Sequence, residues 1–152
     1  MSDFNPDIST LQDRLLKWKS RHSKMTWIGI ILNLLIALPF FFIPEWSMNL
    51  LNIPPVDPIW SRVGAMLLVI ITAFYVPMTI DIDRYRPFCW LSIFPSRTFG
   101  GLYFLIAVAV FQYAPGFLAI ALLDLVIAIL WLFIMLRIVS YENRILAHEA
   151  LS

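Results

Sequence analysis

The chain has 152 residues, of which 61% are hydrophobic and only 14% are charged, and its mean hydropathy is +0.81. Soluble domains are about 45–50% apolar, so most of the surface of this protein must face lipid rather than water. The net charge of +1 argues against a nucleic-acid partner, the length favours a single domain, and a lone cysteine excludes an intramolecular disulfide.

Residues 1–24 are polar and charged, so we expect no cleaved signal peptide and interpret this segment as a short amphipathic helix. Ser9 and Gln12 have the spacing of a capping box, and lysines and arginines lie opposite an apolar face. The helix is expected to lie on the cytoplasmic leaflet, either as an anchor or as a docking site for another protein. The residues of its apolar face are Ile8, Leu11, Leu15 and Trp18.

Four stretches have the length and the low charge of membrane-spanning helices. The third is the shortest, and Pro115 and Gly116 separate it from the fourth by a turn, which makes the last two helices antiparallel neighbours. The sequence thus predicts an all-α polytopic membrane protein with a four-transmembrane-helix bundle. The expected spans are residues 26–43, 59–80, 99–114 and 117–136, within a domain of residues 25–137 that lies between the N-terminal segment of residues 1–24 and a cytoplasmic tail of residues 138–152.

Two of the segments between the spans are expected to lie at the membrane surface. Pro44 suits the first turn of a short helix over residues 44–52. The loop of residues 81–97 mixes charge with aromatic residues that are typical of a headgroup interface. We expect this loop to lie flat on the membrane or to cover the mouth of the bundle.

Lys and Arg are distributed unequally over the two sides of the predicted bundle. Ten of the eleven lie in the N-terminal segment, in the 81–97 loop or in the tail, and only Arg62 lies toward the opposite side. Because positive residues are retained in the cytoplasm, both termini are expected there, in a multi-pass protein of the inner (plasma) membrane.

Asp124 interrupts a fourth span that is otherwise apolar. A carboxylate inside a bilayer is costly unless it is paired, protonated or facing water, so it marks more than bulk packing. Ala121 and Ala128 lie one turn away on the same helical face, and small residues favour close helix contacts. Asp124 should therefore face the interior of the bundle.

Three further polar residues are candidates for one intramembrane network with Asp124. Arg62 enters the second span from the side nearer to Asp124, so an Arg62–Asp124 ion pair is predicted. Gln112 near the outer end of the third span and Asn33 in the first are expected to join it. Three interpretations stay open: a structural network that fixes helix register, a polar pocket in which Arg62 holds an anionic or carbonyl head group, and a proton or ion path.

The sequence gives little support for catalysis or for a cofactor. His22 and His148 lie outside the spans and are expected to be solvated, so a membrane haem is not predicted, and no HxxxH, ExxH or CxxC spacing predicts a metal site. Cys89 lies in an apolar setting and is interpreted as a packing residue. Asp81 and Asp83, next to arginines, are interpreted as members of interfacial ion pairs.

The order of these features resembles that of the DoxX-like group of small bacterial four-helix membrane proteins. The resemblance implies a four-helix bundle in the inner membrane, and some members of the group work beside quinone-linked oxidoreductases. The long N-terminal amphipathic extension is not part of it. The resemblance covers residues 25–137, and its features are a first helix that ends at a proline, Trp60-x-Arg62-x-Gly64 at the start of the second span, an arginine-rich inner loop, and Asp124-x-x-x-Ala128 in the fourth span.

Two classes of function follow from the sequence. In the first, the protein is a non-catalytic accessory or anchoring subunit of a larger membrane complex, because its loops leave no room for a soluble active site. In the second, it binds a lipophilic small molecule such as a quinone or a lipid, with Arg62 and Asp124 near the outer leaflet. The expected partners are the lipid bilayer and either a membrane protein, a second copy or a lipophilic ligand, and no cofactor is expected.

Overall fold

The computed structural model describes residues 7–54 and 56–151. Throughout this part of the chain every regular element is helical. The elements in chain order are α1 (Ile8–Phe42), α2 (Pro44–Leu50), α3 (Pro58–Ala73), α4 (Val76–Ile80), α5 (Arg86–Leu91), the irregular turn η1 (Ser92–Arg97), α6 (Thr98–Ala109) and α7 (Phe117–Glu149).

Four of the described helical stretches are long and apolar enough to cross a membrane. They are α1, α3 together with α4, α5 together with η1 and α6, and α7. The prediction of an all-α, four-helix membrane bundle is therefore confirmed. Short α2 begins at Pro44, as expected for a proline in the first turn of a helix.

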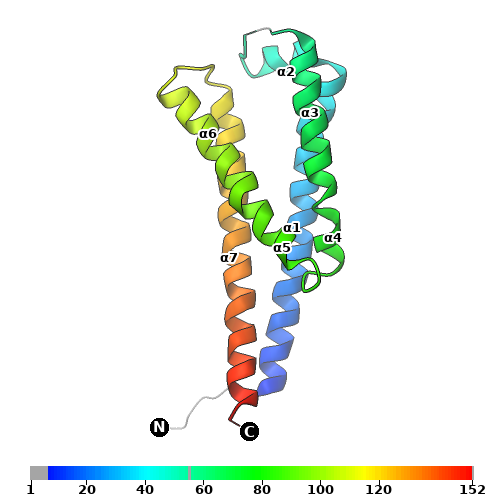
Figure 1. Ribbon diagram of the computed structural model, residues 1–152, viewed down its shortest axis with the longest axis vertical. Helices are drawn as coiled ribbons and strands as arrows, with labels where there is room; N and C mark the ends of the chain where they lie inside the picture. The colour runs from blue at the N-terminus through cyan, green and yellow to red at the C-terminus, as the bar shows by residue number, and fades with distance from the viewer. Residues whose placement is uncertain (1–6, 55, 152) are drawn as a thin grey trace.

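The four crossings form two helix pairs that diverge (Figure 1). α1 packs against α3, α6 packs against α7, and the two pairs are joined by the contact between α1 and α7. The beginning of α1 and the end of α7 lie at the narrow end of the molecule, here called the terminal end (Figure 1). The opposite, distal end holds α2 and the α6–α7 connection (Figure 1). The antiparallel pairing of the last two crossings, predicted from the short connection between them, is confirmed.

α1 runs from Ile8 to Phe42 without interruption, so the amphipathic N-terminal segment is not a separate surface helix. The face that was expected to meet lipid packs inside the protein instead. Leu11 is buried, and the ring of Trp18 lies edge-on to Phe133 of α7, with 5.8 Å between the ring centroids. Residues 8–25 of α1, roughly 27 Å long at 1.5 Å per residue, and residues 137–149 of α7 form a two-helix stalk at the terminal end.

The third crossing differs most from the sequence prediction. It begins at Arg86 rather than at residue 99, and α6 ends at Ala109 rather than at residue 114. Pro95 lacks a backbone donor, and Phe94 is extended (φ −124°, ψ 120°), so the helix changes direction within η1. The segment that was expected to lie flat on the membrane therefore enters the bundle, where Cys89 is fully buried, as a packing residue should be.

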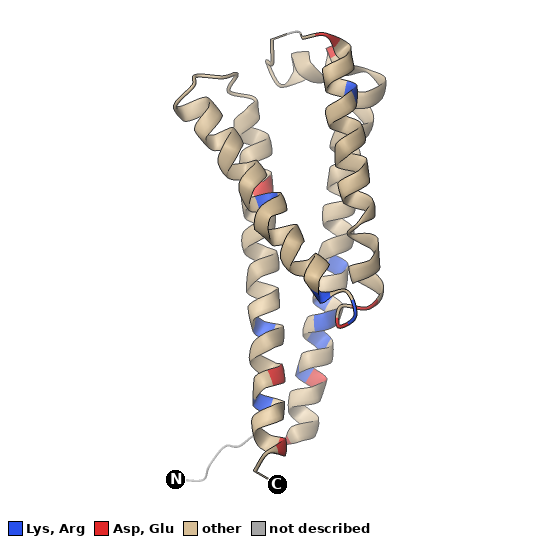
Figure 2. Cartoon of the chain, viewed as in Figure 1, with Lys and Arg blue, Asp and Glu red and all other residues tan. Residues whose placement is uncertain are grey.

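Lys and Arg gather on the terminal half of the molecule (Figure 2). Four charged residues there form an ionic cluster. Lys19 of α1 lies 2.6 Å from Asp83, and Arg86 of α5 donates to Glu142 of α7 at 2.7 and 2.6 Å and to Asp83 at 2.9 Å. The cluster joins three elements at the level where the stalk begins, and it confirms that Asp83 takes part in ion pairs.

Candidate functional site

Asp124 forms its ion pair with Arg97, and the predicted pair with Arg62 is wrong. Nη1 of Arg97 donates to Oδ1 of Asp124, and both side chains lie between the helices. Arg62 is exposed, and its Nε donates to the backbone carbonyl of Phe41 at 3.3 Å. The reason is depth, because Arg62 lies in the first turns of α3 at the distal end, whereas Asp124 lies two turns inside α7.

Asn33 belongs to the network, as predicted, and extends it to all four crossings. Nη2 of Arg97 donates to Oδ1 of Asn33 at 2.7 Å, and Nδ2 of Asn33 donates to the hydroxyl of Thr72 at 2.8 Å. Thr72 in turn donates to the carbonyl of Leu68 at 2.6 Å. Hydrogen bonds therefore run from Asp124 on α7 through Arg97 and α1 to α3, and they fix the relative depth of the helices.

Small residues allow the helices to approach closely enough for this network. A Cβ atom at Gly29 would lie 2.9 Å from the ring of Trp131 and 3.6 Å from Nη2 of Arg97. A Cβ atom at Gly101 would lie 2.7 Å from a side-chain carbon of Leu125. The first glycine lets α1 meet α7 beside the guanidinium, and the second lets α6 meet α7.

Aromatic rings enclose the Arg97 guanidinium, which is charged and 4% exposed. Its central carbon lies 5.5 Å from the ring centroid of Trp131 and 5.8 Å from that of Tyr75. These two rings meet edge-on at 5.4 Å. Cation–π attraction of this kind gains strength where water is excluded, so the rings help to offset the cost of a buried cation.

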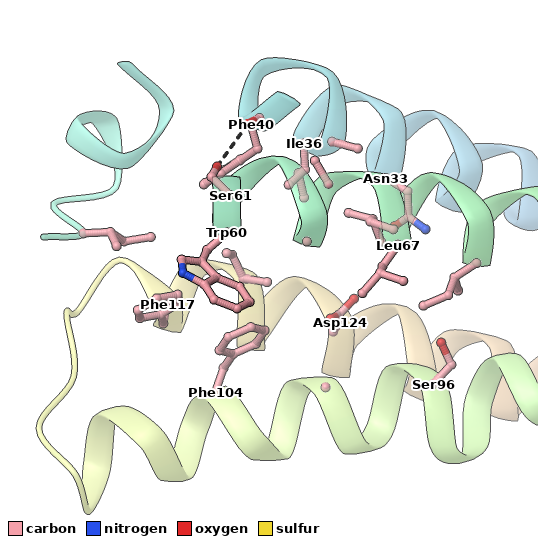
Figure 3. Close-up of a pocket in the computed structure, with 18 of the residues that line it drawn as sticks. Asn33, Ile36, Phe40, Trp60, Ser61, Leu67, Ser96, Phe104, Phe117 and Asp124 are labelled. Carbon is pink, nitrogen blue, oxygen red and sulfur yellow. Dashed lines mark hydrogen bonds between the residues drawn. The ribbon is translucent and has the colours of Figure 1, made fainter. Parts of the chain in front are cut away.

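A cavity of about 510 Å³ lies between the α1–α3 pair and the α6–α7 pair (Figure 3). Its size lies within the ~300–1,000 Å³ range of small-molecule sites. Most of its lining is apolar, and the polar residues gather toward one end. Asn33, Tyr75, Ser96, Arg97 and Asp124 line that polar end, which faces the terminal side.

The distal end of the same cavity is aromatic. Trp60 of α3 points into the space between the two helix pairs, toward Phe104 and Phe117 (Figure 3). The last two rings stack with 5.2 Å between centroids and 5° between planes. Phe117 and Asp124 are about two helical turns apart on α7, so some 10 Å separates the aromatic end from the polar end.

Two residues on α3 show that the cavity reaches the surface of the bundle. Leu67 and Ile71 both line it and are exposed. In the described part of the chain, α3 packs mainly on α1 and α2, and it makes no comparably extensive contact with α6 or α7. The cavity therefore opens sideways, between α3 and the α6–α7 pair, toward the space that lipid fills.

Gln112 does not join the network, and its predicted place is wrong. α6 ends at Ala109, and Gln112 lies in the exposed connection to α7 with a left-handed φ of 54°. Residues other than Gly, Asn and Asp rarely adopt that conformation, which ends the helix and is typical of a turn. A continuous helical reading of residues 99–114 missed this turn.

Arg97 is the residue that the sequence interpretation missed. It was assigned to a surface loop because residues 81–97 mix charge with aromatic residues. One signal was available: a third span of 16 residues is shorter than the roughly 20 that a bilayer needs. Extending it backward would have carried Arg97 into the membrane, at a depth where it can meet Asp124.

His22 was expected to be solvated, but it is 1% exposed within α1. Neither of its ring nitrogens has a hydrogen-bond partner in the described part of the chain. It lies on the same face as the apolar residues that pack against α7, because it follows Trp18 by one helical turn. Separately, no group of three or more His, Cys, Asp or Glu side chains that could hold a metal ion occurs among the described residues.

No protein-family model, curated protein or solved structure matched this chain. The resemblance to DoxX-like proteins therefore stays a prediction. The cavity and the charged residues at its end are the features of this chain that point to a function.

Proposed function

We propose that this membrane protein binds a lipophilic small molecule in the cavity between its two helix pairs. The observation that carries the proposal is the combination of an apolar cavity of about 510 Å³ with a buried Arg97–Asp124 pair at one end. Apolar walls favour a hydrocarbon body, and a small number of fixed polar groups give it orientation.

The sideways opening supports entry of the ligand from the bilayer. Exposed apolar residues at the opening, such as Leu67 and Ile71, offer no barrier to a hydrocarbon. The protein would then act as a binding protein within the membrane, with a polar site formed by Asp124 and Arg97 in place of the predicted Arg62.

For the location we propose the inner membrane, with both termini in the cytoplasm. The beginning of α1 and the end of α7 lie at one end of the bundle, as four crossings require (Figure 1). Removing buried Arg97 from the count of surface charges leaves the excess of Lys and Arg at that end. The positive-inside rule therefore supports a cytoplasmic terminal end.

A second candidate is an accessory or anchoring subunit of a larger membrane complex. The stalk supports it, because residues 8–25 and 137–149 extend past the apolar parts of α1 and α7 and carry exposed charge. A stalk of this kind offers a surface to a protein partner that the membrane does not cover. Both roles could belong to one protein.

Gly64 supplies the variant that tests the cavity. It lines the cavity, and a Cβ atom there would meet no other atom within 4 Å. In Gly64→Leu the Cβ atom therefore meets no neighbour, and the rest of the side chain takes up volume at the cavity. Gly64→Ala is the matched control, because it makes the same backbone change and leaves most of the space open.

The measurement is native mass spectrometry of the protein, gently solubilised from its own membrane. We expect the wild type and Gly64→Ala to retain a lipophilic adduct of low mass and Gly64→Leu to lose it at unchanged abundance. Binding in this cavity would be refuted if Gly64→Leu retained the adduct. It would also be refuted if the wild type carried no adduct. A stoichiometric protein partner without an adduct would establish the subunit role instead.

A further inference from the structure

We propose that the head group of the ligand is a neutral hydroxyl, of an alcohol or a phenol, that donates a hydrogen bond to Oδ2 of Asp124. This inference rests on the proposed function, and it names the chemistry that the polar end of the cavity selects. It differs from the anionic or carbonyl head group that the sequence suggested for Arg62.

Asp124 already neutralises Arg97, which disfavours Arg97 as the group that recognises an anion. One terminal nitrogen donates to Asp124 and the other donates to Asn33. Nε has no hydrogen-bond partner within the described residues, but it is buried and out of reach of the cavity. Because the Arg97–Asp124 pair carries no net charge, a carboxylate or phosphate head group would bring an uncompensated charge into a site lined mostly by hydrocarbon.

Asp124, in contrast, keeps one acceptor open. Its Oδ1 accepts from Arg97, whereas no described residue donates to its Oδ2. The side chain of Asp124 is 19% exposed, against 4% for that of Arg97, and its carboxyl group points into the cavity (Figure 3). An ionised carboxylate accepts several hydrogen bonds, so the free oxygen calls for a donor.

The other polar side chains nearby are already engaged. The hydroxyls of Tyr75 and Ser96 lie 2.8 Å apart and share one hydrogen bond, and Asn33 bonds to both Arg97 and Thr72. Each of these side chains thus has a partner, whereas Oδ2 of Asp124 has none among the described residues and belongs to a side chain that is partly exposed.

The charge of the site decides between a hydroxyl and an ammonium. Arg97 already neutralises Asp124 through a direct ion pair, so the pair carries no net charge. Bringing a second cation into a site lined by hydrocarbon would cost its full desolvation without a free counter-charge. A neutral hydroxyl avoids that cost and supplies the missing donor.

Gly100 allows the contact to be blocked without breaking the ion pair. A Cβ atom at Gly100 would lie 3.4 Å from Oδ2 of Asp124, an ordinary van der Waals contact. Gly100→Ala therefore covers the free oxygen and leaves the bond to Arg97 in place. Gly64→Ala adds the same methyl group elsewhere in the cavity, where it meets nothing, and is the matched control.

The test compares four probes with the same chain: 1-decanol, decyl methyl ether, decanoate and decylammonium. Each is added to the purified full chain in nanodiscs of phosphatidylcholine. The thermal unfolding midpoint is followed by labelling of Cys89, the only cysteine, which is buried until the protein unfolds. Decanol should raise the midpoint by about 3–6 °C for each tenfold rise in concentration above half-saturation.

We expect the ether, which lacks a donor, and both charged probes to raise the midpoint less than decanol does. Gly100→Ala should abolish the difference between decanol and the ether, and Gly64→Ala should keep it. A persistent difference in Gly100→Ala would overturn the inference, as would a larger effect of either charged probe in the wild type.

The outcomes also separate this inference from the proposed function. Equal stabilisation by decanol and the ether, lost for both in Gly64→Leu, would leave a lipophile site and overturn the hydroxyl head group. No stabilisation of the wild type by any of the four probes would overturn both.

Discussion

Arg97 and Asp124 depend on each other, because each would be an uncompensated charge among hydrocarbon without its partner. Breaking a buried pair by removing one partner typically costs about 3–5 kcal/mol, whereas replacing both charges together is often tolerated. Removing Arg97 should therefore cost much more stability than removing Arg62, since Arg62 lies exposed at the distal end.

Arg97→Gln should therefore lower the free energy of unfolding by about 3 kcal/mol, which corresponds to a fall of about 6–12 °C in the thermal midpoint. The double variant Arg97→Gln/Asp124→Asn should recover part of this loss, because no charge remains unpaired. The midpoint can be followed by labelling of Cys89 in detergent.

Arg62→Gln is the control for the loss of an arginine, and we expect its effect to stay within about 0.5 kcal/mol. Similar decreases in the free energy of unfolding in Arg62→Gln and Arg97→Gln would contradict the pairing of Arg97 with Asp124. So would a double variant that is less stable than both single ones.

Two of the four candidate residues of the network were predictable, and the reason is local. Asp124 and Asn33 lie in the middle of long apolar helices with small residues one turn away, so helical geometry alone turns them inward. Arg62 and Gln112 lie near helix ends, where an error of a few residues moves a side chain from the interior to the surface. Arg97 was missed for a related reason, because the beginning of the third crossing was placed at residue 99 rather than at Arg86.

Among the elements, the third crossing shows what single-sequence reasoning misses. Pro87 and Pro95 interrupt the hydrophobic pattern, which reads as a loop even though the chain continues inward through α5 and η1. Pro77, in the first turn of α4, had no such effect on the predicted second span, because the residues around it are uncharged. The packing of neighbouring helices, which sequence periodicity does not contain, holds the broken segment in the bundle.

The ionic cluster at the base of the stalk predicts a particular dependence on pH. The hydrogen bond from Lys19 is the main cause that holds the pKa of Asp83 below its ordinary value, and Arg86 acts in the same direction. A lowered pKa in the folded state means that the stabilisation is complete above the unfolded value of ~3.9 and is lost as the pH falls through the folded value.

The difference in unfolding midpoint between the wild type and Asp83→Asn should therefore be constant from about pH 8 to pH 5 and should shrink below about pH 4. Midpoints measured by tryptophan fluorescence across this range check the prediction. A difference that changed between pH 6 and pH 8 would show that a group other than Asp83 controls it.

At the scale of the whole molecule, the positions of the charges and of the chain ends determine the topology. Cys89 is buried, so single cysteines added to the wild type can report accessibility without a cysteine-free background. Thr10 on the stalk and Glu45 on α2 are both exposed, and they lie at opposite ends of the bundle.

In intact cells, a membrane-impermeant maleimide should label Glu45→Cys but not Thr10→Cys, and permeabilisation should make both reactive. The wild type should remain unlabelled in both conditions. Labelling of Thr10→Cys in intact cells would reverse the orientation that the positive-inside rule predicts.

The fold as a whole was the easiest level to predict, because the membrane sets the length of every crossing. Four apolar runs and one short connection were enough to define the bundle and the pairing of α6 with α7. The divergence of the two helix pairs was not predictable, since it depends on where side chains meet and where they do not. The cavity follows from that divergence.

A cavity that opens sideways exchanges its contents with a two-dimensional reservoir rather than with water. Each buried methylene is worth about 0.8 kcal/mol, so a chain of ten is enriched in the bilayer by about 8 kcal/mol, or close to a millionfold. The protein itself then needs to contribute only modest affinity, through one hydrogen bond and good packing. Occupancy of the site should follow the mole fraction of the ligand among the lipids. Dilution with buffer should therefore leave the site nearly full. Dilution with fresh lipid should empty it.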